Sequence, residues 1–348
     1  MRVAILSLFD FDEVRGGTEL FVRHLQKVFP DSENITYSSC ARLLPALDLS
    51  AVNLERERMG LVISRDFAKR HKRKPYDLVI CNDIAGLGLK VLAPQVPALQ
   101  IFHYTYRGFA EGVLHGSPGY WPSRYIHFNF ERLLANGKKV VAVSHKTRRE
   151  LERYYGLSAH VIENAVSLER FKPLPQADCR ARLGIKWDGP IGIYVGRTDF
   201  AKGFDVVKGL ARRRKDIRIL CVTGGDYQDE DMIIARRVSN DDMPVYYSAS
   251  DFLLFPSRYE SASYTTIEAM ACDLPVVGHR TGLFEDVDEK DVGRIISVLN
   301  EEEFSKGIDH VLTHSRISTR RIAEKRFSME RFTNDYWALA LEMTKTTN

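Results

Sequence analysis

The sequence predicts an α/β protein of two domains, each built on a parallel sheet that is covered by helices. Its 348 residues exceed what one hydrophobic core usually serves, and an apolar content of 44% is enough for two cores. In the first half, short apolar runs at 3–8, 77–81, 98–102 and 139–143 alternate with segments of helical periodicity. This alternation is typical of parallel strands joined by crossover helices.

The second half repeats the alternation after a stretch that contains several prolines. Strand-like runs occupy 191–195 and 217–222, and the prolines bracket a linker near 170–188. We therefore expect an N-terminal domain over 1–168 and a C-terminal domain over 186–328.

The stretch 251–277 carries most of the functional interpretation. It opens with an apolar run closed by proline, as a buried parallel strand ends. Thr265, three residues before Glu268, has the capping-box pattern, so we expect a helix to begin near Ser263 to Thr265 with Glu268 in its first turn. Glu260 then lies in the loop before the helix, and a new strand starts at Leu274.

A loop that enters a helix at the carboxyl edge of a parallel sheet offers free backbone N–H groups to an anion such as phosphate. Carboxylates beside such a site would repel phosphate, so Glu260 and Glu268 are expected to accept hydrogen bonds from hydroxyl groups of the same ligand. A ligand with phosphates between two polyols is a sugar nucleotide. The alternative is that Glu268 only completes the cap of Thr265, which needs no ligand.

Glu260, seven residues, Glu268, and then Ala-Met-Ala and Leu-Pro-Val-Val resemble the E-x7-E signature of glycosyltransferase family 4. The resemblance implies a retaining, metal-independent enzyme with the GT-B fold, in which two Rossmann-like domains with parallel sheets face each other across a cleft. It also implies that Glu260 and the amides after it hold the donor sugar and phosphate, while Glu268 holds the ribose. The residues that would supply those amides are Ser261, Ala262, Ser263 and Tyr264.

Other donor-binding residues in the second half follow from the same resemblance. Arg197 and Lys202 stand five apart across a strand-to-helix turn and match the family's pair that clamps the diphosphate. A bidentate Arg and a point-charge Lys suit that task, although an unrelated pair of surface charges would look the same. Gly224 follows the strand 217–222 in a glycine turn and is expected near the donor.

In the first half, Gly16 and Gly17 stand where a helix begins, and His103 directly follows a strand. The resemblance implies that the glycines let the backbone approach the donor phosphates, and that His103 contacts the transferred sugar or the acceptor. A plain turn and a strand-end histidine that satisfies a backbone group are the alternatives. The resemblance further implies that a final helix, at about 329–345, packs back on the N-terminal domain.

The implied reaction is transfer of a hexose from a nucleoside diphosphate sugar to a hydroxyl of a glycan or lipid-linked acceptor. The leaving diphosphate, held by Arg197 and Lys202, would take the acceptor proton, while His103 and Glu260 orient the sugar. No cofactor and no required metal are expected. The alternative is a nucleotide-sugar-binding protein of the same fold with another activity, either epimerase-like or non-catalytic.

Two further classes are disfavoured by the motifs. A metal-dependent transferase would use Asp-x-Asp, and the triplets 10–12, 229–231 and 286–288 are interpreted as solvated loops. A Rossmann dehydrogenase would need G-x-G-x-x-G after the first strand, which is absent. The five cysteines show no spacing typical of zinc or redox sites.

Charge is distributed unevenly along the chain. Residues 1–170 hold 24 Lys and Arg against 18 Asp and Glu, a balance of +6, whereas 171–348 hold 26 against 28, a balance of −2. The basic run 69–74 is interpreted either as a solvated helix end or as a contact with an anionic membrane. We expect no nucleic-acid partner. Without an apolar span of 18 residues or a signal peptide, a cytoplasmic protein is expected, with peripheral attachment to the inner face of the membrane left open.

Overall fold

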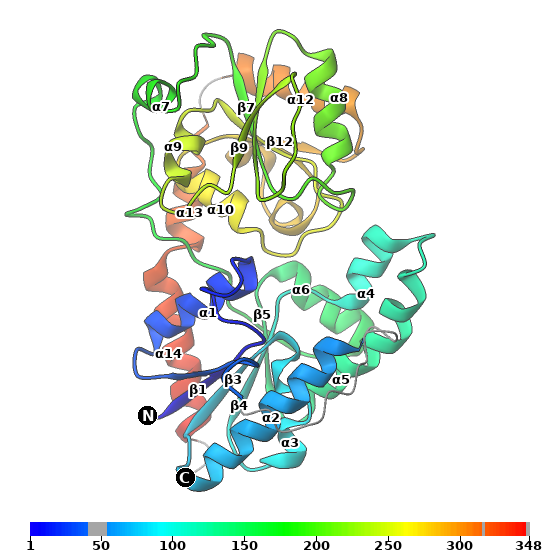
Figure 1. Ribbon diagram of the computed structural model, residues 1–348, viewed down its shortest axis with the longest axis vertical. Coiled ribbons are helices and arrows are strands. Elements are labelled where there is room, and N and C mark those ends of the chain that lie inside the picture. Colours follow the sequence, from blue (N-terminus) through cyan, green and yellow to red (C-terminus); the bar gives the residue numbers. More distant parts are fainter. Residues whose placement is uncertain (41–53, 315–316, 346–348) are drawn as a thin grey trace. The chain divides into compact units, whose positions relative to one another are not determined.

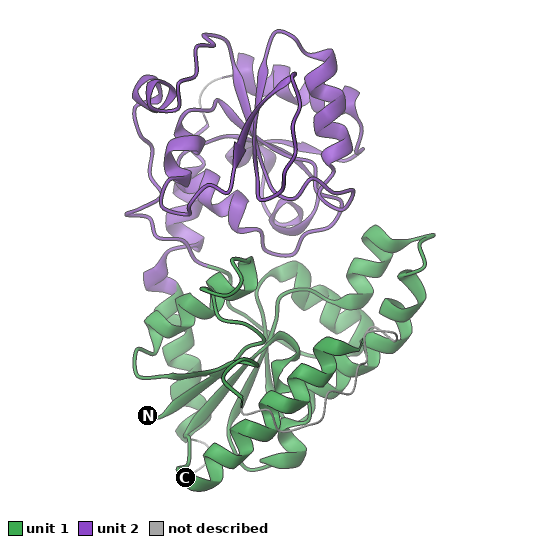
Figure 2. Ribbon diagram, viewed as in Figure 1, with its two compact units in different colours: residues 1–164, 332–348 green, residues 165–331 purple. Residues whose placement is uncertain are grey.

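The computed structural model describes residues 1–40, 54–314 and 317–345. The chain divides into two compact units, shown in Figure 2. Unit 1 comprises Met1–Asn164 and Phe332–Asn348, and unit 2 comprises Ala165–Arg331. Among the described residues, no helix has both the length and the hydropathy that crossing a bilayer requires.

Unit 1 contains a six-stranded sheet in the order β2-β1-β3-β4-β5-β6, and every neighbouring pair of strands is parallel. The strands are β1 (Val3–Leu6), β2 (Glu33–Ile35), β3 (Leu78–Asn82), β4 (Ala98–Phe102), β5 (Lys139–Ala142) and β6 (His160–Val161). The helical segments are α1 (Gly17–Val28), α2 (Glu55–Arg73), η2 (Asp83–Gly86), α3 (Leu89–Leu92), α4 (Tyr106–Phe109), η3 (Ala110–Leu114), η4 (Pro122–His127), α5 (Phe128–Ala135), α6 (His145–Glu150), η5 (Leu151–Tyr155) and α14 (Met329–Lys345).

Helices cover both faces of this sheet, as Figure 1 shows. On one face, strand residues such as Ala4 and Leu6 pack with α2, α3 and α5 in one buried cluster. On the other face, α1 and α14 pack together through Phe21, Phe332 and Tyr336, all fully buried. The end of the chain therefore completes the core of the unit that the beginning of the chain forms.

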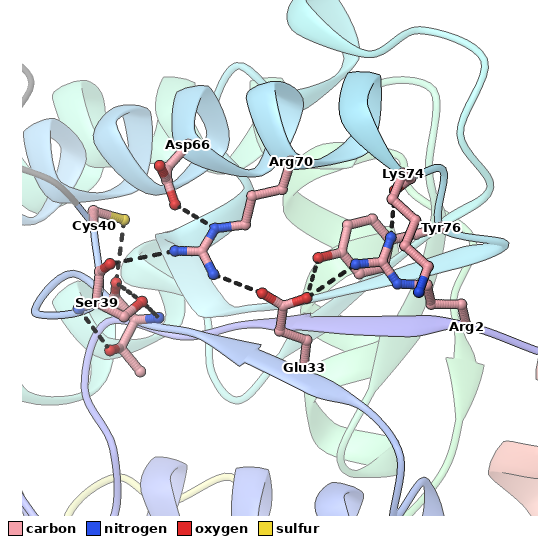
Figure 3. Close-up of polar contacts among 9 residues, drawn as sticks. Arg2, Glu33, Ser39, Cys40, Asp66, Arg70, Lys74 and Tyr76 are labelled. Carbon is pink, nitrogen blue, oxygen red and sulfur yellow. Dashed lines mark hydrogen bonds and ion pairs between the residues drawn. The ribbon is translucent and has the colours of Figure 1, made fainter.

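A polar cluster fastens the edge strand β2 to α2 (Figure 3). Arg70 donates to Glu33 at 2.6 Å and to Asp66 at 2.7 Å, and the Tyr76 hydroxyl also donates to Glu33. Burial opposes ionisation of Glu33, but the hydrogen bonds from Tyr76 and Arg70 outweigh it and lower the pKa of the carboxyl. Arg70, one of the basic residues in 69–74, is thus part of the fold.

Unit 2 contains a second six-stranded parallel sheet, in the order β12-β11-β10-β7-β8-β9. The strands are β7 (Ile191–Val195), β8 (Arg218–Thr223), β9 (Met232–Arg236), β10 (Phe252–Phe255), β11 (Val276–His279) and β12 (Gly293–Ile296). The helical segments are α7 (Gln176–Arg182), α8 (Phe204–Arg213), α9 (Met243–Ser248), α10 (Tyr264–Ala271), η6 (Gly282–Glu285), α11 (Glu289–Val292), α12 (Glu301–Thr313) and α13 (Arg320–Arg326).

The order of the strands decides where a ligand can bind in each sheet. In unit 2 the order reverses between β7 and β10, and in unit 1 it reverses between β1 and β3. Loops that leave the carboxyl ends of two such strands diverge and leave a crevice between them. The α/β class expected from the sequence is confirmed in both units.

Candidate functional site

The loops after β7 and β10 meet at the point in unit 2 where the strand order reverses. The Lys202 ammonium forms an ion pair with the Glu260 carboxylate. The Lys202 side chain is 28% exposed and that of Glu260 is 14% exposed, so the pair is only partly open to solvent. Two residues that are 58 positions apart in the sequence, both predicted to bind the donor, are therefore in direct contact.

Close packing holds these two loops together. Gly203 has φ +67°, and a Cβ at this position would lie 2.0 Å from the Pro256 carbonyl oxygen, so only glycine fits. Arg258, in the second loop, donates to both carboxylate oxygens of Asp205 at 2.7 and 2.8 Å and lies 3.5 Å from the ring centre of Phe200. The first loop and the start of α8 are thereby fixed against the loop that carries Glu260.

Arg197 is held by an acid that the sequence analysis did not single out. Its Nε lies 2.9 Å from Asp199 Oδ2, and the other oxygen of Asp199 accepts from the backbone N–H of Lys202 at 3.0 Å. Asp199 thus links the two cations. The Arg197 side chain is 73% exposed, in contrast to Lys202. No sequence signal distinguishes Asp199, because acids are common in strand-to-helix turns.

The loop that carries Glu260 is supported from the end of β11. The Glu260 backbone N–H donates to Thr281 Oγ1 at 3.1 Å, and Thr281 is buried. Gly282 has φ +60°, and a Cβ there would lie 3.0 Å from the Ser261 carbonyl oxygen. Thr281 and Gly282 therefore position the acidic loop, a role that the sequence analysis did not assign to them.

Glu268 has a different environment from the one expected. The helix α10 begins at Tyr264 with Ser263 as its N-cap, and no side chain caps it. Thr265 is the second residue of the helix, too late to cap it, so the capping-box interpretation is wrong and Glu268 lies beyond the first turn. Instead, Glu268 is buried and accepts a hydrogen bond of 2.9 Å from the Tyr247 hydroxyl. Burial raises the pKa of Glu268 to about 7, against the opposing effects of Tyr247 and Arg170.

The remaining predicted donor contacts in unit 2 flank this region. The predicted amide donors occupy the turn after Glu260 and the first position of α10; they are Ser261, Ala262, Ser263 and Tyr264. Gly224 follows β8, next to β7, and a Cβ there would meet nothing within 4 Å. A cavity of about 510 Å³ in the same unit lies at the other end of the strands, since Asp251 and Pro275, which precede β10 and β11, line it. Its lining includes none of the predicted site residues.

Gly16, Gly17 and His103 belong to unit 1. Gly16 is the N-cap of α1 and Gly17 its first residue, as expected for a helix start. His103 Nε2 lies 2.6 Å from Asn82 Oδ1, and its ring meets Phe21 edge-on at 4.7 Å. Burial lowers the pKa of His103 to about 4, so the imidazole is neutral at pH 7. The roles assigned to these three residues stay predictions.

The acidic triplets make local contacts. Asp10 accepts from the Asp12 backbone at 3.1 Å, Asp229 accepts from the Asp231 backbone at 3.0 Å, and Asp288 caps α11. In the described part of the chain, no group of three or more His, Cys, Asp or Glu side chains could hold a metal ion.

Solved structures with the same architecture define the fold class. Sucrose-phosphate synthase (tll1590) from Thermosynechococcus elongatus matches with a TM-score of 0.83 at 20% identity, covering 99% of this chain and 100% of that one. Anabaena Alr3699/HepE, solved with UDP-glucose, matches at 0.75 and 17% identity, with coverages of 99% and 100%. WaaG, a lipopolysaccharide glycosyltransferase, matches at 0.67 and 16% identity, with 100% of both chains covered. The fold is GT-B.

Sequence comparison supplies the family. The model described as Glycosyltransferase Family 4 matches residues 36–170, and that described as Glycosyl transferases group 1 matches residues 189–314. The chain belongs to glycosyltransferase family 4. The resemblance identified from the E-x7-E stretch, and the GT-B fold that it implied, are confirmed.

Curated relatives match over part of their length. The putative teichuronic acid biosynthesis glycosyltransferase TuaC of Bacillus subtilis is 28% identical over 178 residues, which cover 47% of this chain and 45% of TuaC. D-inositol 3-phosphate glycosyltransferase of Xylanimonas cellulosilytica is 27% identical over 189 residues, which cover 45% of each chain. The chain spans about half the length of these relatives.

Proposed function

We propose that this chain is a retaining glycosyltransferase that moves a hexose from a nucleoside diphosphate sugar to a hydroxyl of a glycan or lipid-linked acceptor. The observation that carries the proposal is the convergence of Lys202 and Glu260 at the reversal of strand order in unit 2. Family membership supports it, as do the glycosyltransferase names of the relatives and the UDP-glucose bound to HepE.

In the proposed mechanism the protein stabilises the leaving group. Negative charge builds on the diphosphate as the bond to the sugar breaks, and Arg197 and Lys202 interact more strongly with that charge than with the ground state. Glu260 accepts from hydroxyls of the donor sugar, and Glu268 from those of the ribose. His103, neutral at pH 7, orients the sugar or the acceptor by hydrogen bonding.

Neither a protein nucleophile nor a metal ion is required in this scheme. The departing diphosphate takes the proton of the acceptor hydroxyl on the face from which it leaves, so the new bond forms with the configuration of the old one. Lys202 and Arg197 supply the positive charge that a metal ion supplies in other transferases.

The competing function is nucleotide-sugar binding without transfer, or epimerisation. A thermal-shift screen with UDP, GDP and ADP sugars selects the donor, because a ligand of the folded state raises its melting temperature. Proton NMR of the product formed with a simple glycoside acceptor then reports the anomeric configuration. We expect the product to retain the anomeric configuration of the donor, and we expect EDTA to leave turnover unchanged. Inversion, loss of turnover in EDTA, or epimerised donor without transfer contradicts the proposal.

We also propose contact between unit 1 and an anionic membrane through the end of α2. Lys69, Lys72 and Arg73 are exposed there, whereas Arg70 is engaged by Glu33 and Asp66. Exposed cations near an anionic bilayer contribute about 1 kcal/mol each. Such contact would place the enzyme on the inner face of the membrane, where a lipid-linked acceptor could be reached.

A further inference from the structure

We infer that Glu260 makes the donor site prefer an intact nucleotide sugar to the nucleoside diphosphate left after transfer, because Glu260 competes with the diphosphate for Lys202. This inference rests on the proposed function and concerns the same site. It assigns Glu260 a part in selecting the ligand and in releasing the product, in addition to contact with the donor sugar.

The contact between Lys202 and Glu260 lies in a sheltered part of the proposed site. Both side chains are more than two-thirds buried, and the backbone of Glu260 is fixed by Thr281. Partial burial weakens the screening of the pair by water, so the attraction is stronger than in a surface ion pair. Of the two cations assigned to the diphosphate, Lys202 is the more buried, and Glu260 offsets its charge.

Arg197, the second cation, is more exposed than Lys202, and this difference provides a control. Arg197 is also paired, with Asp199 at 2.9 Å, but its side chain is 73% exposed and that of Asp199 is 41% exposed. Water screens such a pair, so separating it costs little. Effective competition with the diphosphate is thus expected from Glu260 and not from Asp199, although both acids lie beside the same pair of cations.

A nucleoside diphosphate and an intact nucleotide sugar differ in the hydrogen-bond donors that they offer to the Glu260 carboxylate. A bare nucleoside diphosphate must either share Lys202 with the carboxylate or displace it, and a displaced, mostly buried carboxylate without a partner is unfavourable. An intact donor displaces it as well, but its sugar hydroxyls can donate to the carboxylate oxygens. The site should accordingly bind the donor well and release the diphosphate once the sugar has left.

Glu260→Gln tests the inference, because it removes the charge and keeps the shape. Isothermal titration calorimetry with UDP, GDP or ADP, whichever the thermal-shift screen selects, and with its glucose conjugate gives both affinities. We expect Glu260→Gln to bind the diphosphate about fivefold to tenfold more tightly than wild type, a change of about 1 to 1.4 kcal/mol. The conjugate should bind less tightly, so the preference for it falls by more than tenfold.

The matched control is Asp199→Asn, which removes one negative charge from the same site and keeps one oxygen that can accept from the Lys202 backbone N–H. Its diphosphate affinity should change by less than about twofold. Thermal melting without nucleotide checks that each variant folds. A Glu260→Gln protein that binds the diphosphate with wild-type or lower affinity overturns the inference, as does an equal gain in Asp199→Asn. If the wild type binds no nucleotide, the proposed function itself fails.

Discussion

In the proposed donor site, single charged side chains are expected to decide both binding and turnover. Lys202 emerges from a turn fixed by Gly203 and reaches the second loop, so its ammonium has a defined position. A pre-positioned cation acts on charge that develops in the transition state without reorganisation. Its removal should therefore be visible in the rate more than in ground-state binding.

Lys202→Ala is expected to lower kcat by about 100-fold to 1,000-fold, the usual effect of losing one pre-positioned charge donor. KM for the donor should change much less, and steady-state kinetics with varied donor separates the two. Lys208→Ala is the control. It removes a half-buried lysine of α8 that has no role in the proposed site, so it should keep wild-type turnover. Wild-type turnover in Lys202→Ala would exclude the role assigned to this residue.

Glu268 makes the stability of the protein depend on pH. Its pKa is raised to about 7 by burial, whereas an unfolded glutamate titrates near its ordinary pKa of 4.5. Between these values the folded state holds a proton that the unfolded state has lost, so stability is highest below about pH 4.5 for this group and falls as pH rises to 7. The full difference is about 3 kcal/mol.

Glu268→Gln should remove this dependence. Urea unfolding at pH 5 and pH 8 is expected to show a smaller loss of stability in the variant than in wild type, while nucleotide affinity falls because the ribose contact is weakened. Glu230→Gln, at an exposed loop position, should behave as wild type. An unchanged pH profile in Glu268→Gln would mean that another group causes the dependence.

At the scale of elements, the site depends on how closely the loops after β7 and β10 approach each other. Gly203→Ala places a Cβ against the Pro256 carbonyl and imposes φ +67° on a residue that disfavours it. A loss of about 2 kcal/mol or more in the free energy of unfolding is expected, together with weaker nucleotide binding. Gly224→Ala, where a Cβ meets nothing, should leave stability unchanged in the same urea titration.

The strands and helices also differ in whether the sequence predicts them. Central strands such as β3, β4 and β10 are continuous buried runs, so periodicity identified them. The edge strands β2 and β9 have mostly half-exposed residues, and the sequence analysis identified neither: β2 has a single apolar residue, and the apolar run of β9 is short. The start of α10 was placed within a residue or so, yet its capping was not, because Glu268 finds its partner 21 residues upstream in Tyr247.

The same limit applies to the candidate site. Glu260 and Lys202 were identified from a motif and its register, and the structure places them in contact. Asp199 and Thr281 act through hydrogen bonds that form only once the sheet is assembled, and their residue types are common in loops. Motif spacing therefore found the side chains that would touch the ligand, and missed those that hold them.

At the scale of the whole molecule, the exposed cations of α2 lead to a binding prediction. Charge reversal at Lys72 and Arg73 should reduce sedimentation with phosphatidylglycerol vesicles by at least tenfold, since each basic residue contributes about 1 kcal/mol. The matched double variant reverses Arg321 and Lys325, exposed residues of α13 in unit 2, and should bind as wild type. Equal losses in both pairs, or binding to neutral vesicles alone, would contradict a specific contact by α2.

The passage of α14 from unit 2 into unit 1 has a consequence for biosynthesis. Phe332 and Tyr336 close the core around Phe21, and they are synthesised only after the whole of unit 2. Unit 1 therefore cannot complete its packing until unit 2 has been synthesised, even though the six strands of its sheet are made before unit 2 begins. Unit 2, formed from one continuous stretch, has no such delay.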